Sequence, residues 1–269
     1  MKKKLTYSFL QITLLLVLLT GCAASSTGKV DQVQQRGTLL VGSTGDYRPL
    51  SYLEPSTGQY WGFDADIAYI IAKDLGVKVQ YVPTSWPTLT QDMLNDTLFD
   101  LAICGISITD ARKEIMLMSE GYLCNGKTIL CRKEDEERFL SIADMNKSEV
   151  VVMVNPGGLN EKFANENLPD AQIVVHEKNE EIPALVAEDK ADIMITEIVE
   201  APYYVQHDQR LAAPLLDKPF TDSLIGVLMR KGDEDLLLRV NGIIERCKND
   251  GTLKSLHDKY GFNYGFSHD

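Results

Sequence analysis

Short β-rich runs alternate with helix-forming segments along most of this 269-residue chain, and this alternation limits the fold more than any other feature. The run "TLLVGST" (38–44) predicts a strand. Apolar residues at helical spacing from Ile67 to Leu75, with Gly76 as a stop signal, predict a helix before the next strand, "VKVQYVP". A helix in "TLTQDMLND" and a buried strand in "FDLAICG" follow. Such alternation implies a mainly parallel sheet with helices on its faces.

A second set of the same kind begins after the extended segment "GKTILCRK". Strands are predicted in "EVVVMV", "AQIVVH" and "ADIMIT", with helices in "LNEKFANEN" and "EEIPALVAEDK" between them. Extended segments near 126–132 and 216–224 connect the two sets, and the tail predicts two helices broken at Gly251. We therefore predict a two-lobed α/β protein, with lobe 1 at 37–127 and 224–269 and lobe 2 at 128–223.

The amino-terminal segment carries the pattern of a secretory signal. Three lysines precede a short apolar stretch that ends in "LTGC", and a polar segment follows at once. We predict a signal at 1–21, and the last four letters resemble the bacterial lipobox, which implies a lipid on Cys22; the alternative is an ordinary signal with a chance cysteine. A lipid would anchor the protein to a membrane without spanning it, on the extracytoplasmic side. The small, polar residues 22–36 predict a flexible tether.

The composition excludes several classes of function. The formal charge is -12, and an acidic chain repels phosphate backbones, so nucleic-acid binding is not expected. Any anionic ligand must therefore be held by a local cluster of donors. No cysteine pair has CxxC spacing and the histidines form no HxxxH or HExxH pattern, so no metal site is expected. Cys124 and Cys131 could form a disulfide, although buried thiols are the better default.

Four segments follow predicted strands and lead into helices: "STGDYRPLSY", "CGISITDAR", "VNPGGLNEK" and "ITEIVEAP". Open α/β sheets bind ligands at the carboxyl ends of their strands, where such loops meet. Two lobes with two extended crossings also form a cleft. The ligand site is therefore predicted in this cleft, where the four segments converge.

The segment "VNPGGLNEK" predicts an anion site. Asn155, Gly157 and Gly158 would leave backbone N–H groups free at the start of a helix, near Asn160, where a carboxylate is stabilised without a side-chain charge. The alternative is a tight turn that only requires glycine.

The segment "GISITDAR" offers a second anion-binding group. Ser107 and Thr109 precede a predicted helix, with Thr109 as its N-cap, and Arg112 then lies in the first turn. A positive charge there opposes the helix dipole, and a guanidinium can hold a carboxylate through two parallel hydrogen bonds. A salt bridge to Glu114 is the alternative.

Glu197 and Glu200 lie just before Pro202, a residue that a helix accepts only in its first turn. Both acids could complement the helix dipole or act as a capping box, or one of them could be an acid catalyst. Lys127 begins the first crossing, so its side chain could reach the cleft or remain in solvent. Composition and spacing leave these alternatives open.

From about residue 38 the chain resembles the type II periplasmic solute-binding proteins of amino-acid ABC transporters. The segments "TGDYRPLSY…GFDADIA", "GISIT..R" and "DGTL…KYGF" carry this resemblance. "VPTSWPTL", "NGKT", "VNPGGLNEKFA", "NLPDAQIVVH" and "EIVEA" further resemble the cyclohexadienyl dehydratases, a family of enzymes on this scaffold. These enzymes remove water and CO2 from prephenate, giving phenylpyruvate, and from arogenate, giving phenylalanine.

This resemblance implies roles for individual residues. Glu200 falls on the general acid of the dehydratases, Lys127 on a catalytic lysine and Arg112 on the arginine that holds a carboxylate. Glu197 falls where amino-acid-binding proteins often hold a ligand ammonium. Substrate contacts are also expected from Trp86, beside the ring, and from Asp46. Leu159 departs from the pattern, because a hydroxyl residue is usual at its position.

Two functions follow from the resemblance. The first is an extracytoplasmic dehydratase that needs no cofactor. The second is a lipid-anchored binding protein that delivers an amino acid or another carboxylate to an ABC permease. Both share a fold and a closure motion, so the fold does not discriminate between them.

Overall fold

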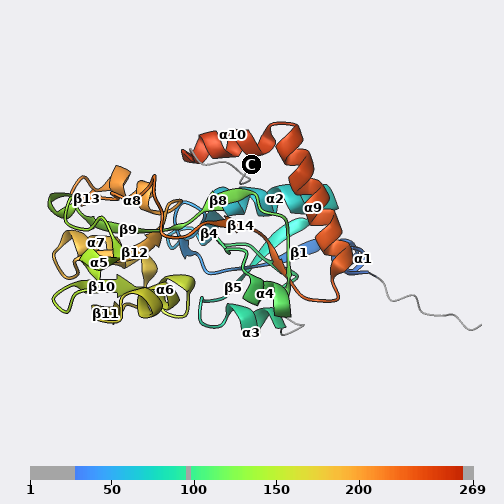
Figure 1. Ribbon diagram of the computed structural model, residues 1–269. Coiled ribbons are helices and arrows are strands. Elements are labelled where there is room, and N and C mark those ends of the chain that lie inside the picture. Colours follow the sequence, from blue (N-terminus) through green and yellow to red (C-terminus); the bar gives the residue numbers. More distant parts are fainter. Residues whose placement is uncertain (1–27, 95–97, 263–269) are drawn as a thin grey trace, which may run out of the picture.

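The computed structural model describes residues 28–94 and 98–262, which form two lobes around two five-stranded sheets (Figure 1). The predicted signal at 1–21 and the lipid site at Cys22 lie outside the described residues. No helix in the described part of the chain is long and apolar enough to cross a membrane.

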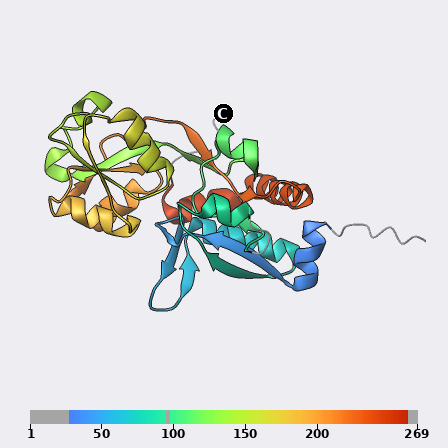
Figure 2. The ribbon, with the colours of Figure 1, turned by 90° about the horizontal axis from the view of Figure 1, so that it is seen from below.

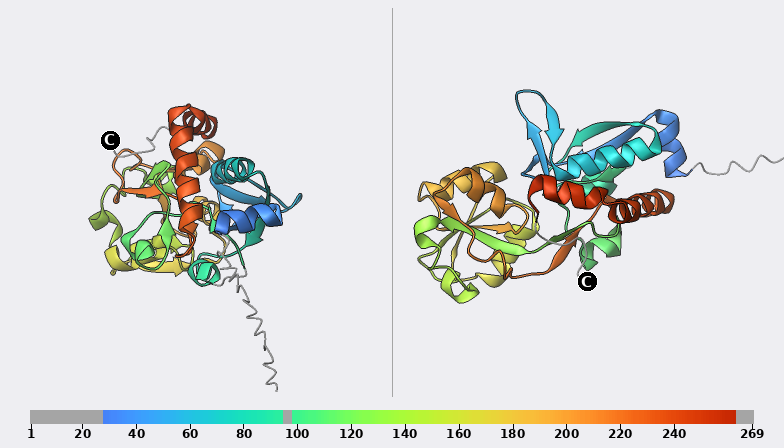
Figure 3. Two further views of the ribbon diagram at one scale, coloured as in Figure 1. Left: turned by 90° about the vertical axis from the view of Figure 1, so that its right-hand side faces the viewer. Right: turned by 90° about the horizontal axis from the view of Figure 1, so that it is seen from above.

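The first lobe contains the sheet with strand order β5-β1-β6-β15-β7. Its strands are β1 (Thr38–Ser43), β5 (Lys78–Pro83), β6 (Leu101–Ala102), β7 (Leu117–Met118) and β15 (Leu228–Met229). Its helices are α1 (Lys29–Arg36), α2 (Phe63–Leu75), α3 (Leu89–Leu94), α4 (Asp110–Ile115), α9 (Glu234–Asn249) and α10 (Thr252–Tyr260). A small antiparallel sheet, β2 (Asp46–Tyr47), β3 (Ser51–Glu54) and β4 (Gln59–Trp61), extends from this lobe (Figures 2 and 3).

The second lobe contains the sheet with strand order β11-β10-β12-β9-β13. Its strands are β9 (Lys127–Arg132), β10 (Val151–Val154), β11 (Gln172–Val175), β12 (Ile193–Glu197) and β13 (Leu211–Ala212). Its helices are α5 (Ile142–Met145), α6 (Leu159–Asn167), α7 (Ile182–Ala187) and α8 (Ala201–His207), with 3-10 turns η1 (Lys133–Asp135) and η2 (Asn179–Glu181).

The chain passes between the lobes through two paired strands, β8 (Leu123–Asn125) and β14 (Ser223–Ile225), which lie side by side in Figure 1. The prediction of a two-lobed α/β fold is therefore confirmed. The crossings lie elsewhere than predicted: the segment 126–132 is mostly β9 of the second sheet, with the crossing just before it, and the predicted second crossing, 216–224, overlaps β14 only at its end. The predicted lobe boundaries, at 127/128 and 223/224, fall at the start of β9 and within β14, and we keep them as a proposal.

Each sheet is mixed, and the antiparallel strands are those that return from the crossing. In the first sheet β15 is antiparallel to β6 and β7, and in the second β9 is antiparallel to β12 and β13. The β9–β12 register places Lys127 directly opposite Glu197. This pairing determines much of the ligand site.

The prediction of a flexible tether over residues 22–36 is wrong for Lys29–Arg36, which form helix α1. Val33 is fully buried, and the main-chain N–H of Val30 donates to Asp235 on α9 over 2.9 Å. Gly37 ends the helix in the left-handed conformation that glycine adopts at low cost. The polar composition of α1 reflects its exposed faces. One buried valine, together with polar contacts such as the ion pair of Arg36 with Asp100, attaches the helix to the lobe.

The described cysteines do not support the disulfide between Cys124 and Cys131. Cys131 is a buried, free thiol on β9, and its sulfur donates to the carbonyl oxygen of Ala212 over 3.7 Å. The default of buried thiols therefore holds for Cys131, Cys104 and Cys247.

We predict that Val33→Ala destabilises the protein by roughly 1–3 kcal/mol, because it removes two buried methyl groups and leaves a cavity between α1 and the rest of the lobe. Urea unfolding measures the change, with the exposed Gln35→Ala on the same helix as the control, expected within about 0.5 kcal/mol of wild type. Equal unfolding curves for the two variants would contradict a structural role for α1.

Candidate functional site

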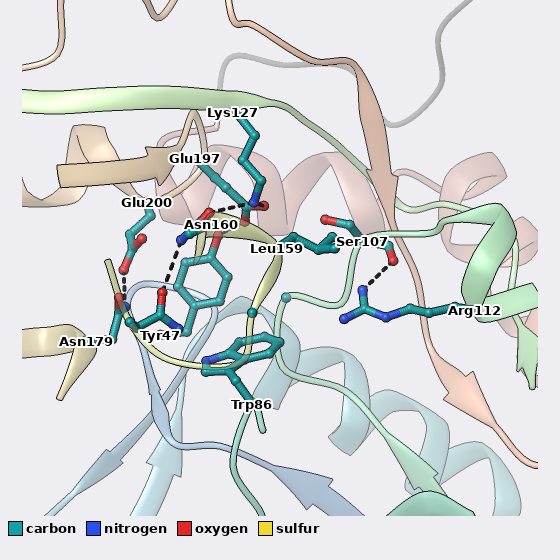
Figure 4. A pocket seen from close by; sticks show the side chains of 13 residues that line it. Tyr47, Trp86, Ser107, Arg112, Lys127, Leu159, Asn160, Asn179, Glu197 and Glu200 are labelled. Atoms are coloured by element: carbon teal, nitrogen blue, oxygen red, sulfur yellow. Dashed lines mark hydrogen bonds and ion pairs between the residues drawn. The ribbon is translucent and has the colours of Figure 1, made fainter. Parts of the chain in front are cut away.

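A pocket lies between the lobes at the carboxyl ends of the parallel strands and contains about 360 Å³ of space, its open mouth included (Figure 4). Aromatic, basic, acidic and amide side chains all face it. The lining residues are Tyr47, Trp86, Gly105, Ser107, Arg112, Lys127, Asn155, Gly158, Leu159, Asn160, Asn179, Glu197 and Glu200. Segments from all four predicted loops contribute, so the predicted convergence is observed.

Lys127 and Glu197 form a buried ion pair at the end of the β9–β12 ladder. The Lys127 Nζ lies 2.6 Å from Glu197 Oε1 and also donates to Asn160 Oδ1 over 2.6 Å. Tyr47, from the other lobe, donates its hydroxyl proton to Glu197 Oε2. Burial alone would raise the pKa of Glu197, but the charge and hydrogen bond of Lys127 and the Tyr47 hydrogen bond lower that pKa overall. Glu197 is therefore a stable carboxylate.

Glu200 lies in a contrasting environment on the turn between β12 and α8. It is fully buried, with Oε2 accepting from Thr196 Oγ1 over 2.5 Å and Oε1 accepting from Asn179 Nδ2 over 2.7 Å. Desolvation outweighs these hydrogen bonds and raises the pKa of Glu200 to about 8. At neutral pH most Glu200 side chains hold a proton. A buried carboxylic acid in a ligand pocket can donate that proton to a bound molecule.

The two acids therefore do not act as helix caps. Glu197 ends strand β12, and Glu200 occupies the N-cap position of α8 but makes no side-chain hydrogen bond to the helix. Of the two acids, Lys127 pairs with Glu197 and not with Glu200. The antiparallel register is the cause, since it brings Lys127 opposite Glu197.

Two further segments, the loop that ends at Arg112 and the start of α6, bring groups suited to a carboxylate into the pocket. Thr109 caps α4 as predicted, accepting from the Arg112 N–H over 3.3 Å. The Arg112 guanidinium enters the pocket, where Nη1 donates to the Ser107 carbonyl over 2.7 Å, and burial lowers the pKa of Arg112. Gly158 and Asn160 line the pocket at the amino-terminal end of α6, where main-chain N–H groups lack partners within the helix.

Three predicted ligand residues do not line the pocket. Thr109 uses its hydroxyl as the helix cap. Asp46 accepts from Trp86 Nε1 over 3.2 Å and so positions the indole. The Gly157 N–H is not free, because it donates to Glu161 over 2.6 Å, and Gly157 instead packs against Pro87 of the other lobe. Gly157 therefore contributes no free N–H to the predicted anion site.

Tyr47, Gly105 and Asn179 line the pocket but were not predicted. Tyr47 lies within the quoted loop "STGDYRPLSY", and its position requires Gly105, where an added Cβ would lie 2.2 Å from the tyrosine ring. Asn179 follows strand β11 at its carboxyl end. The rule that selected the other four loops would have selected "HEKNEE" as a fifth.

Contacts across the pocket hold the lobes together. Besides Tyr47 and Glu197, Asn179 Nδ2 of the second lobe donates to the Asp46 carbonyl of the first over 3.3 Å. The same amide nitrogen also donates to Glu200. The position of the Glu200 carboxyl is thus linked to the approach of the two lobes. No cluster of metal-ligating side chains was found among the described residues.

A family model for bacterial extracellular solute-binding proteins, family 3, matches residues 39–263. The chain belongs to this family, and its fold is that of the type II periplasmic amino-acid-binding proteins. Family members of this kind are extracytoplasmic solute-binding proteins.

Individual relatives include both an enzyme and binding proteins. The chain is 37% identical to a cyclohexadienyl dehydratase of Pseudomonas aeruginosa over 82% of this chain and 81% of that protein. It is 26% identical to the ABC transporter glutamine-binding protein GlnH of Bacillus subtilis, over 91% of this chain and 92% of the relative.

Two solved ancestral proteins are also similar. The amino acid-binding protein AncCDT-1, described as a precursor of cyclohexadienyl dehydratase, is 37% identical with a TM-score of 0.79, over 87% of this chain and 99% of that one. A variant of the ancestral cyclohexadienyl dehydratase AncCDT-3 is 49% identical with a TM-score of 0.54, over 87% of this chain and 97% of that one.

We predict that the stability of the protein depends on pH through Glu200. The unfolded carboxyl titrates near 4.5 and the folded one at about 8, so the folded state holds an extra proton between these values and stability falls as pH rises through this window. Glu200 should lower the free energy of unfolding by on the order of 1 kcal/mol per pH unit in this window. Urea unfolding of wild type and Glu200→Gln from pH 5 to 8 measures it.

The Glu200→Gln variant should lose this slope while retaining that of Asp64, a second buried acid whose pKa burial raises to about 7. The stability of the variant relative to wild type should therefore increase with pH. Parallel stability curves for the two proteins would show that Glu200 is ionised throughout.

Proposed function

We propose that this protein is an extracytoplasmic cyclohexadienyl dehydratase, which removes water and CO2 from a cyclohexadienyl carboxylate such as prephenate or arogenate. The observation that carries the proposal is Glu200, a fully buried acid whose pKa is raised to about 8 and which faces a pocket with two basic side chains. The similarity to an enzyme of this activity, at 37% identity, supports it.

In the proposed reaction Glu200 donates its proton to the ring hydroxyl. The carbon–oxygen bond breaks and water leaves, while the bond from the ring to its carboxylate breaks, and the released electron pair completes the aromatic ring. CO2 departs, and Glu200 regains a proton from solvent. A general acid of this kind contributes about 10²–10⁴-fold to the rate.

The other pocket residues would hold the substrate. Arg112 and the start of α6 would bind the side-chain carboxylate, and Lys127 would lie near the ring carboxylate, since its ammonium faces the pocket beside Glu197. The Trp86 indole, held by Asp46 and packed edge-on to Tyr47, offers an apolar surface for the ring. The contacts between the lobes would exclude water and keep the substrate in one pose.

A second candidate function is ligand delivery to an ABC permease, as in the binding proteins of the same family. The observation in its favour is the lobe architecture, which matches that of an ancestral amino acid-binding protein. Both side chains that would distinguish the enzyme, Lys127 and Glu200, are buried beside the pocket, with 7% and 0% of their surface exposed. This arrangement favours the dehydratase. We propose further that a lipid on Cys22 anchors the protein outside the cytoplasmic membrane.

We predict that the purified protein converts prephenate to phenylpyruvate at neutral pH and that Glu200→Gln lowers kcat by about 10²–10⁴-fold, since the variant has no proton to donate. Absorbance of phenylpyruvate follows the reaction, with the spontaneous rate subtracted. The exposed Glu188→Gln is the matched control and should retain full activity. Wild-type turnover equal to the spontaneous rate would refute the proposed function and leave ligand delivery.

The pH profile provides a separate test. Because the acid must be protonated, kcat/KM for prephenate should fall about tenfold per pH unit above about pH 8, the pKa of Glu200 in the unliganded protein. Stopped assays between pH 6.5 and about 9.5 would measure the profile. A value of kcat/KM that stays constant or rises over this range would be inconsistent with Glu200 as the general acid.

A further inference from the structure

Glu197 is the acid that stays charged in the pocket, and each of its oxygens already accepts a hydrogen bond. Oε1 lies 2.6 Å from Lys127 Nζ, and Oε2 accepts from the Tyr47 hydroxyl. A ligand ammonium that approached Glu197 would have to share the carboxylate with these two donors. It would also lie beside the buried Lys127 ammonium, where the repulsion between two positive charges is poorly screened.

The charges of the remaining lining residues do not compensate for this. Arg112 is positive, and no ion pair to its guanidinium is found in the described part of the chain. Glu200 is mostly neutral at pH 7, and the asparagines on the lining are uncharged amides. The nearby Asp46 is directed to Trp86 Nε1, and burial raises its pKa, which disfavours its charged form. The lining therefore carries a net positive charge, which favours carboxylates and disfavours ammonium groups.

We propose that the buried Lys127–Glu197 pair makes this pocket selective for α-keto acids over the corresponding α-amino acids. The proposal rests on the proposed function and specifies its substrate class: prephenate, with a keto group, would be preferred over arogenate, which has an ammonium in its place. A keto oxygen is a hydrogen-bond acceptor, so it can face the donors of Lys127 or Asn160 without displacing any of them.

The test is a comparison of binding by the purified full chain. Phenylpyruvate and L-phenylalanine differ only at the keto or ammonium position, and isothermal titration calorimetry at pH 7 measures both dissociation constants. Wild type should bind phenylpyruvate at least about tenfold more tightly, which corresponds to about 1.4 kcal/mol. Prephenate and arogenate should show a preference of the same direction in kcat/KM.

Variants separate the ion pair from the general positive charge. Lys127→Met frees Glu197 to accept an ammonium and should shift the ratio of the two constants toward phenylalanine by about tenfold or more. Arg112→Met should weaken both ligands without changing the ratio, because both carry the same carboxylate. Lys162→Met is the control for removing a lysine near the cleft, since Lys162 is exposed and faces Glu166 at 3.8 Å. It should leave both constants unchanged.

Several results would overturn the selectivity. These are equal or tighter binding of phenylalanine by wild type, an unchanged ratio in folded Lys127→Met, and no binding of either ligand at millimolar concentration. If Lys127→Met does not fold, the comparison of phenylpyruvate and phenylalanine binding by wild type still tests the selectivity. Preference for the keto acid without prephenate turnover would refute only the enzyme, whereas equal turnover of prephenate and arogenate would refute only the selectivity.

Discussion

The antiparallel pairing of β9 with β12 is the constraint on which the site depends. β9 enters the second lobe directly from the crossing, and its first residue, Lys127, lies opposite the last residue of β12, Glu197. Because side chains of directly opposed residues lie close together, the register alone places an ammonium against a carboxylate at the inter-lobe surface. Tyr47 of the first lobe then donates a hydrogen bond to Glu197. The Glu197 carboxylate therefore takes part in the strand pairing, in the contact between the lobes and in the charge of the pocket.

Two glutamates three residues apart consequently have opposite properties. Both are buried, which favours the protonated form of each, but only Glu197 has a cation beside it. Glu200 is surrounded by the neutral donors of Thr196 and Asn179, which are too weak to offset desolvation. A pair of acids whose environments separate their pKa values is a common way for one pocket to hold both a fixed charge and a transferable proton.

The fold itself is compatible with both candidate functions, and its relatives include both. The difference between a binding protein and an enzyme on this scaffold therefore lies in a few side chains of the cleft. In this protein the amide of Asn179 contacts both the Glu200 carboxyl and the main chain of the other lobe. Closure, which a binding protein uses to retain a ligand, would here also position the proposed acid.

The sequence by itself determined the two α/β lobes and most of the loops that form the pocket, because strand and helix periodicity and the position of loops after strands are local patterns. It did not determine α1, a polar segment that is attached to the lobe by one buried valine and by long-range hydrogen bonds and ion pairs. It also did not determine that Lys127 pairs with Glu197 or that the Gly157 N–H donates to Glu161. Nor did it show that Tyr47 and Asn179 reach the pocket. Those facts depend on strand register and on the contact between lobes, which bring together residues far apart in the chain. Only the tertiary structure decides burial, and burial is what makes Glu200 an acid that holds its proton.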